Sequence, residues 1–400
     1  MSLSLYLDRR KWYRHIDETE QHYPGFVPVI KGNGYGFGNE YLAEVALEKK
    51  KKVIAVGTVD EARQLGKIGT FSEVIVLTPV MTELTRADLV SGRTYTVGSR
   101  EQLRFLVKSF DRLLAEQGSV WSEMDVTFRL NILLKCESTM KRYGFSLQDA
   151  ERIPDWIDGV QTDRVHVEVA GMSIHFPKER MTAAAREKQI GDWVRVMDRI
   201  DPSRRKMYLS HLTPAQYQAV VDRWPTIDFS IRLGTDLWLA DKSFVETKST
   251  VLDVKPIRRG ERFGYKQLRS PRTGHLVYVA GGTANGVGLE APACARGVKD
   301  WAKLTAFWLL GLVNRHLSPF SYRGKRLWFA EPPHMQTSVL LVPSGAPLPR
   351  PGEELPVQLR MTTAVFDRQV IVEDEVLELT ERNPIPSQHE EKGNAVEAIP

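Results

Sequence analysis

A single lysine stands between an apolar run and a glycine-rich turn near the start of the chain. Residues 26–30 (FVPVI) have the composition of a short buried strand, and Lys31 follows them directly. The next eight residues contain four glycines, which allow the backbone to approach a bound anion closely. We therefore expect Lys31 to point into a ligand site, the alternative being a lysine that ends the strand in solvent.

A lysine in such a place is suited to covalent chemistry. Burial disfavours the ammonium form, and the neutral amine that results is nucleophilic enough to form a Schiff base with an aldehyde. The aldehyde that fits an amine beside an anion-binding turn is pyridoxal 5'-phosphate. The pattern around Lys31 thus predicts a cofactor-carrying lysine.

Residues 29–38 (VIKGNGYGFG) closely resemble the lysine motif of alanine racemases and their fold-type III relatives, V-V-K-x-N-x-Y-G-x-G. This resemblance implies that Lys31 carries pyridoxal phosphate and that Tyr35 reaches its phosphate. Phe37 departs from the motif, which usually has histidine there.

Residues 134–145 (LKCESTMKRYGF) resemble a second racemase segment, K-x-D-T-G-M-x-R-x-G. Lys135 and Arg142 keep the spacing of its lysine and arginine. By this resemblance Lys135 is carbamylated and orients Arg142, which contacts the cofactor's phenolic oxygen and the substrate carboxylate. Glu137 replaces the usual aspartate, and Ser-Thr replaces Thr-Gly.

Two polar segments follow later apolar runs. Residues 171–176 (GMSIHF) are similar to the family's G-x-x-T-H-F, which implies that His175 stacks on the pyridine ring. In residues 210–214 (SHLTP), hydroxyl groups precede a proline at the first turn of a helix, which is typical of an N-cap and of a phosphate site. Thr213 is our candidate phosphate ligand there, and ordinary helix capping is the alternative.

Residues 230–238 (SIRLGTDLW) resemble V-R-x-G-x-x-L-Y-G. The resemblance implies that Arg232 hydrogen-bonds the pyridine nitrogen and that the N–H groups of Gly234 and Thr235 hold phosphate. Because a guanidinium keeps its proton, Arg232 would leave the pyridine nitrogen unprotonated and the ring a weak electron sink. A weak sink favours racemisation over transamination.

The C-terminal part holds two further likenesses. Residues 260–265 (GERFGY) resemble G-E-x-V-x-Y, whose tyrosine is the second catalytic base, so Tyr265 takes that role. Residues 333–336 (PHMQ) stand where the family has a Ser-Met-Asp turn, and Met335 is the candidate whose N–H receives the substrate carboxylate.

Two departures concern the substrate. Thr283 stands near the place of a tyrosine that narrows the family's active-site entrance, and a wider entrance would admit a larger amino acid. Residues 355–380 lack a clear counterpart of the tyrosine that closes over the substrate.

Recurring elements set the expected architecture, which is α/β. Eight short apolar runs alternate with helix-like segments in residues 1–242, which predicts an N-terminal (β/α)8 TIM barrel. Strand-like alternation in residues 243–380 predicts a C-terminal, mostly-β domain. Residues 381–400 have the composition of a mobile tail. The predicted barrel strands lie at 26–31, 53–57, 73–78, 93–97, 125–134, 164–174, 207–210 and 228–233.

Composition limits the classes of function. A net charge of +5 favours small anionic ligands, but the basic residues are scattered among 50 acids, so no nucleic-acid partner is expected. Two cysteines and an N-terminus without an apolar signal segment are typical of a cytoplasmic protein. The apolar stretch 307–313 is too short for a bilayer, so we expect a buried helix there and no membrane partner. No metal site is predicted.

Taken together, the resemblances imply a pyridoxal-phosphate-dependent amino-acid racemase, an isomerase that interconverts L- and D-amino acids with Lys31 and Tyr265 as opposed bases. They also imply a head-to-tail homodimer whose active site is shared between the subunits. Two alternatives stay open: a fold-type III amino-acid decarboxylase, and a non-catalytic pyridoxal-phosphate-binding homeostasis protein. The second lacks a β-domain, which counts against it here.

Overall fold

The chain forms two compact units in a computed structural model that describes residues 2–66, 68, 70–116, 127–201, 205–289, 295–373 and 376–378. The barrel unit consists of residues 11–243 with residues 361–364. The β unit consists of the described residues within 1–10, 244–360 and 365–400. The tail predicted at 381–400 lies outside the described residues.

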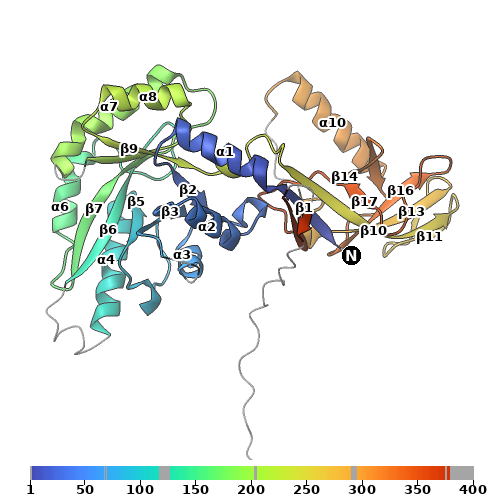
Figure 1. The fold of residues 1–400 in the computed structure, drawn as a ribbon, viewed down its shortest axis with the longest axis horizontal. Coiled ribbons are helices and arrows are strands. Elements are labelled where there is room, and N and C mark those ends of the chain that lie inside the picture. Colours follow the sequence, from blue (N-terminus) through green and yellow to red (C-terminus); the bar gives the residue numbers. More distant parts are fainter. Residues whose placement is uncertain are drawn as a thin grey trace, which may run out of the picture. The chain divides into compact units, whose positions relative to one another are not determined.

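The barrel unit is a closed ring of eight parallel strands with helices outside it (Figure 1), which confirms the predicted (β/α)8 fold. Pairing of the last strand with the first closes the ring, with Val27 opposite Arg232. Small and branched side chains such as Val29, Ala55 and Ile75 fill its interior. The strands are β2 (Val27–Ile30), β3 (Val53–Val56), β4 (Glu73–Val76), β5 (Arg93–Val97), β6 (Phe128–Cys136), β7 (Val165–Ile174), β8 (Lys206–Leu209) and β9 (Asp228–Leu233).

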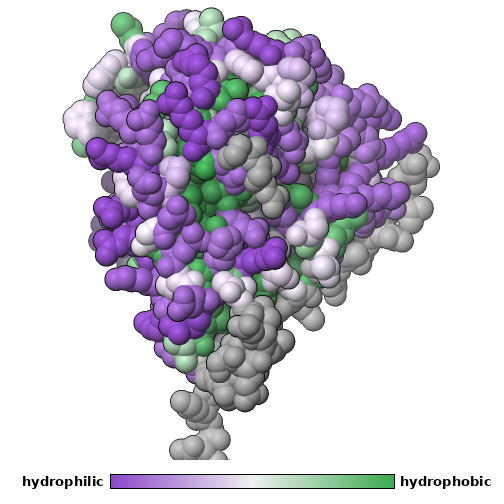
Figure 2. All heavy atoms as spheres, turned by 90° about the vertical axis from the view of Figure 1, so that its left-hand side faces the viewer, coloured by the Kyte–Doolittle hydropathy of each residue, from purple (hydrophilic) through white to green (hydrophobic). Residues whose placement is uncertain are grey.

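The helices of this unit bury apolar residues, and four of them begin at a hydroxyl cap. Hydroxyl groups of Thr58, Ser99, Thr182 and Thr213 each accept the backbone N–H three residues on, which satisfies a donor that the helix leaves open. The helices are α1 (Arg9–His22), α2 (Asn39–Glu48), α3 (Val59–Leu65), α4 (Arg100–Ala115), α6 (Ile153–Asp158), α7 (Ala183–Ile200), α8 (Pro214–Arg223) and α9 (Thr235–Trp238). On the face in Figure 2 hydrophilic residues predominate, and hydrophobic ones show mainly in a central strip.

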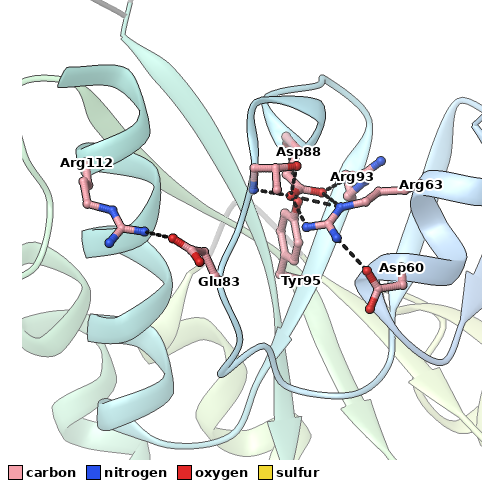
Figure 3. Close-up of polar contacts among 8 residues, drawn as sticks. Asp60, Arg63, Glu83, Asp88, Arg93, Tyr95 and Arg112 are labelled. Atoms are coloured by element: carbon pink, nitrogen blue, oxygen red, sulfur yellow. Dashed lines mark hydrogen bonds and ion pairs between the residues drawn. The ribbon is translucent and has the colours of Figure 1, made fainter. Parts of the chain in front are cut away.

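A buried carboxylate joins α3 to β5 (Figure 3). Asp88 is fully buried and accepts hydrogen bonds from Arg93 Nη1 at 2.7 Å, Arg63 Nε at 3.0 Å and the Thr85 N–H at 2.8 Å. Burial works against the charged form, but these hydrogen bonds and the two guanidinium charges outweigh it and lower the pKa of Asp88. The cluster therefore fixes helix to strand through a fully satisfied buried charge.

The β unit is built on one long sheet, whose strand order is β14-β15-β16-β13-β10-β1-β18-β19. A further strand, β17, pairs with β10. Its buried residues Val277, Phe320 and Leu340 belong to one hydrophobic core. The strands are β1 (Leu3–Asp8), β10 (Val245–Ile257), β11 (Arg262–Phe263), β12 (Leu268–Arg269), β13 (Gly274–Ala280), β14 (Leu317–Tyr322), β15 (Lys325–Phe329), β16 (Thr337–Pro343), β17 (Glu354–Pro356), β18 (Arg368–Glu373) and β19 (Val376–Glu378).

Residues 2–10 belong to the β unit and not to the barrel, and residues 3–8 of them form a strand of this sheet, so the predicted boundary of 1–242 is wrong at its start. β1 pairs antiparallel with β10 and parallel with β18. Leu3, Leu5 and Leu7 are buried, and an alternating pattern of this kind fits a strand of the β unit.

The apolar helix α10 (Val298–Leu312) differs most from expectation. The sequence predicted that residues 307–313 are buried, yet α10 has no buried residue, and Trp308 is 64% exposed. The high apolar content of this segment predicted burial, but composition alone does not identify the residues that would pack against the helix. In the described part of the chain no helix combines the length and apolarity needed to cross a bilayer.

Candidate active site

A cavity of about 840 Å³ opens at the carboxyl ends of the barrel strands. Parallel strands deliver the residues that follow them to one end of the barrel, which explains why motifs far apart in sequence meet there. Every residue that lines the cavity belongs to the barrel unit. The structure brings together these predicted site residues: Lys31, Tyr35, Lys135, Arg142, His175, Thr213, Arg232, Gly234 and Thr235.

Lys31 follows β2 and lines this cavity. Its side chain is open to solvent within the cavity, yet the walls crowd it closely enough to desolvate the ammonium, and the charge of Arg142 adds repulsion. Both effects lower the pKa of Lys31. Glu61 holds the turn after the lysine, since Oε1 accepts the Gly32 N–H at 2.7 Å while Oε2 accepts the Gly57 N–H at 2.6 Å.

Tyr35 and Gly234 meet at one side of the cavity. Tyr35 has a left-handed backbone (φ 56°), made possible by the glycine turn around it, and its ring is buried. A Cβ at position 234 would lie 2.2 Å from the Tyr35 hydroxyl, so only glycine fits there. Desolvation raises the pKa of Tyr35, which therefore keeps its phenolic proton and can donate it to an anion.

Lys135 is buried in β6, unlike Lys31. Its Nζ lies 3.5 Å from the Ser173 carbonyl oxygen. Desolvation, with the charge of Arg232 next in importance, lowers the pKa of Lys135 to about 7. Near neutral pH a large fraction of this amine is uncharged. Lys135 can therefore act as a nucleophile, although it is buried in the cavity wall.

His175 is held in one orientation by its neighbours. The Ser210 hydroxyl lies 2.8 Å from Nδ1, and the His211 ring packs edge-on at 5.0 Å between centroids. Desolvation and the charge of Arg232 lower the pKa of His175 to about 2, so the ring is neutral at physiological pH. A neutral, fixed imidazole offers a flat face for stacking.

Arg232 on β9 carries an unpaired donor. Its side chain is buried and Nη2 lies 3.5 Å from the Ile174 carbonyl oxygen, but Nε has no partner among the described residues. An unsatisfied buried N–H costs on the order of 1–3 kcal/mol. Such an atom in a cavity wall fits a ligand acceptor, and the pyridine nitrogen of pyridoxal phosphate is one. In the described ranges no cluster of three or more His, Cys, Asp or Glu residues suits a metal ion.

Charge in the cavity wall is strongly positive. Besides Lys31 and Lys135, whose pKa values are lowered, it carries Arg142, Lys178, Arg186 and Arg232, against the single carboxylate of Asp236 among the lining residues. Such a surface favours an anionic ligand with a phosphate group. The residues present therefore fit pyridoxal phosphate.

Thr213 lines the cavity and also caps a helix. Its hydroxyl accepts the Gln216 N–H at 3.3 Å, and the Gln216 side chain accepts the Thr213 N–H at 3.1 Å. This reciprocal cap starts α8 and matches the alternative role given to Thr213 from sequence.

The sequence missed the segment that returns to the barrel. Asn33 Nδ2 donates to the carbonyl oxygens of Met361 at 2.8 Å and Ala364 at 2.7 Å, and Thr362 lines the cavity. The asparagine of the lysine motif thus fixes a stretch from the far end of the chain. The only sequence feature that pointed to this contact was Asn33 itself, and an asparagine alone does not show which residues it will bind.

Tyr265 and Met335 lie in the β unit, where they are 86% and 73% exposed. The Met335 carbonyl oxygen accepts the Ala284 N–H at 2.9 Å. The Tyr265 ring packs against His334 with 4.8 Å between centroids, and Glu331 lies beside both. No role was predicted from sequence for Glu331 or His334.

Comparison with known proteins identifies the family. The model of the alanine racemase N-terminal domain matches residues 7–238. Alanine racemase 2 of Clostridium acetobutylicum is 22% identical over 66% of this chain and 65% of its own length, and the alanine racemase of Streptococcus equi subsp. zooepidemicus is 25% identical over 63% and 66%. These alignments thus cover slightly less than two thirds of each relative.

Solved structures show the same fold at low identity. Alanine racemase from Bacillus anthracis with bound L-Ala-P has a TM-score of 0.67 at 16% identity, covering 95% of this chain and 97% of that one. Histidine racemase from Leuconostoc mesenteroides has a TM-score of 0.62 at 16% identity, covering 93% and 98%. The family model spans more than half of the residues, and the chain therefore belongs to the alanine racemase family.

Proposed function

We propose that this chain is a pyridoxal-phosphate-dependent amino-acid racemase that interconverts L- and D-amino acids. The observation that carries the proposal is a pair of groups in one cavity: the Lys31 amine, whose pKa is lowered, and the buried, unpartnered Nε of Arg232. The Lys31 amine is suited to a covalent bond with an aldehyde, and Arg232 Nε is suited to donate a hydrogen bond to a ring nitrogen.

The cavity residues divide the work of holding the cofactor. Lys31 carries it, His175 stacks on its ring and Arg232 donates to its nitrogen. Tyr35 with the N–H groups of Gly234 and Thr235 takes the phosphate, and the Thr213 hydroxyl, which only accepts a hydrogen bond in its cap, can donate its proton there as well. Bound pyridoxal phosphate supplies an electron sink for the charge left at Cα when its proton departs. A covalently bound pyridoxal phosphate is named for the racemase of Bartonella henselae, a structural neighbour.

The protein's own groups move the proton. Lys31 exchanges it at one face of Cα and the Tyr265 phenol exchanges it at the other, because inversion needs a base on each side. The Met335 N–H and the Arg142 guanidinium bind the substrate carboxylate.

Tyr265 comes from the second subunit of a head-to-tail homodimer. The enzyme works in the cytoplasm. Light scattering at working concentration tests the dimer.

Lys135 serves this site as a carbamate. The amine reacts with CO2 when neutral, which a pKa of about 7 allows. The product is an anion beside two arginines, where an ammonium would be repelled. Carbamylation therefore turns a costly buried cation into a partner for Arg142 and Arg232. Intact-protein mass spectrometry after chemical trapping of the carbamate tests this assignment.

The decisive experiment is solvent deuterium incorporation at Cα. Purified, cofactor-loaded protein is incubated in deuterated water with a panel of L- and D-amino acids, including alanine and histidine, and followed by NMR and chiral chromatography. Exchange with inversion for one substrate supports the racemase and identifies its side chain. Release of CO2 without inversion would instead establish the decarboxylase, and an inert protein would leave only cofactor binding.

A further inference from the structure

We infer that Glu331 and His334 act as positioning residues for the Tyr265 base. The inference rests on the proposed function of Tyr265 and assigns roles to two residues that have none in the mechanism above. Both belong to the β unit, as does Tyr265, and the argument uses only contacts within that unit.

Glu331 holds Tyr265 in two ways. Its carboxylate is buried, and Oε2 accepts the backbone N–H of Tyr265 at 3.2 Å. Its other oxygen, Oε1, lies 3.0 Å from His334 Nε2. The His334 ring in turn packs against the Tyr265 ring at an angle of 65°, the edge-to-face arrangement that aromatic rings prefer. One carboxylate therefore restrains the backbone of Tyr265 directly and its side chain through His334.

The neighbouring glycine is shaped for this carboxylate. Gly264 has a left-handed backbone (φ 68°), and a Cβ there would lie 2.0 Å from Glu331 Oε2. A side chain at position 264 would displace the carboxylate from the Tyr265 N–H. Gly264 thus has two roles. It turns the chain before Tyr265, and its lack of a side chain leaves room for the Glu331 carboxylate.

A restraint matters because Tyr265 is almost fully exposed. An exposed side chain samples several rotamers, and a base that must face Cα loses rate whenever it points elsewhere. Within the β unit the only ring packed on Tyr265 among the described residues is that of His334. His334 therefore reduces the number of orientations open to the phenol.

The same carboxylate organises the loop that carries Met335. The His334 N–H donates to the Thr337 carbonyl oxygen at 2.9 Å, and the His334 carbonyl oxygen accepts the Thr283 N–H at 2.8 Å. His334 is thus fixed at both backbone groups as well as at its ring. Glu331 connects the Tyr265 turn to the loop proposed to bind the substrate carboxylate, so the two move as one piece.

The test compares His334→Ala with His316→Ala, which removes an exposed histidine of the same unit. The first readout needs neither cofactor nor substrate: NMR of the Tyr265 ring in protein with labelled tyrosine. Removing His334 takes away its ring-current effect, so the Tyr265 resonances shift, whereas His316→Ala leaves them in place. Unchanged Tyr265 resonances in His334→Ala would overturn the inferred contact.

The second readout is solvent deuterium exchange at Cα with retention of configuration, measured separately from each enantiomer before inversion. His334→Ala lowers this exchange about tenfold for the enantiomer whose proton Tyr265 removes and leaves the exchange of the other enantiomer nearly unchanged, since only the orientation of Tyr265 is lost. Glu331→Ala acts alike, and Glu331→Gln, which keeps one acceptor and one donor, restores most of the rate. Equal losses of exchange with retention for both enantiomers, or no loss, would overturn the inference alone. A wild type that exchanges no amino acid would overturn the proposed function and the inference with it.

Discussion

Two lysine amines with lowered pKa share one cavity, and the structure distinguishes their roles. Lys31 is reachable from the cavity, whereas Lys135 is 4% exposed and lies within the wall. A cofactor as large as pyridoxal phosphate needs a reachable amine. We therefore predict that borohydride reduction attaches the cofactor only to the peptide that contains Lys31, as read by mass spectrometry after digestion.

Variants sharpen this prediction. Lys31→Ala abolishes the attachment and the visible absorbance of the bound cofactor. Lys178→Ala is the matched control, because this lysine also lines the cavity but is paired with Asp236 at 3.0 Å, and its loss leaves the attachment intact. Attachment at Lys135 in the wild type would contradict the assignment of Lys31.

At the scale of residues, sequence was informative where a reactive or hydrogen-bonding side chain stands at the carboxyl end of a strand or directly after it. Lys31, His175 and Arg232 each stand in such a motif, and the barrel brings them to one cavity. The bonds from Asn33 to Met361 and Ala364 could not be predicted, because a contact across more than 300 positions depends on the folded path of the chain. Glu331 was missed for the same reason.

Among the elements, the connection between α3 and β5 depends on one buried carboxylate. Asp88→Asn leaves the buried Arg93 without its counter-charge, so we expect a loss of about 3–5 kcal/mol in the free energy of unfolding. Asp60→Asn is the control: Asp60 also pairs with Arg63, but its side chain is 72% exposed, and its loss costs at most about 1 kcal/mol. Urea denaturation of the variants measures both. A similar cost for the two would contradict the role given to Asp88.

The same carboxylate gives the barrel unit an acid-sensitive contribution. Because the pKa of Asp88 is lowered in the folded state, its stabilisation is fully present above the ordinary carboxyl pKa of about 3.9 and is lost as pH falls through the lower folded value. The stability difference between wild type and Asp88→Asn is therefore constant from pH 7 to about pH 5 and shrinks below about pH 4. Denaturation curves at several pH values show this, and a difference that grows in acid would refute it.

Local patterns predicted all the barrel strands but not the membership of β1. Each barrel strand is an apolar run beside a helix-like segment, so period and order sufficed. β1 is equally regular, with Leu3, Leu5 and Leu7 on one face. Its partners β10 and β18 lie hundreds of residues away, and nothing local indicates them. Because β1 precedes the barrel strands in the chain, it was assigned to the barrel unit, which is wrong.

For the molecule as a whole, α10 tests whether apolar sequence means burial. Within the β unit Phe320 is fully buried, whereas Trp308 on α10 is 64% exposed. We predict that Phe320→Ala costs about 3–5 kcal/mol, as expected for a core aromatic residue. Trp308→Gln changes the free energy of unfolding by less than about 0.5 kcal/mol, since its side chain is mostly exposed.

Both variants report on the unfolding of one unit, so the same urea curves followed by circular dichroism compare them directly. Trp308→Gln also removes exposed apolar area, which raises the concentration at which the protein stays dispersed in light scattering. A loss near 2 kcal/mol for Trp308→Gln would mean that α10 is covered in solution. The apolar stretch at 307–313 would then be buried as its composition first indicated, by a surface that the described residues do not supply.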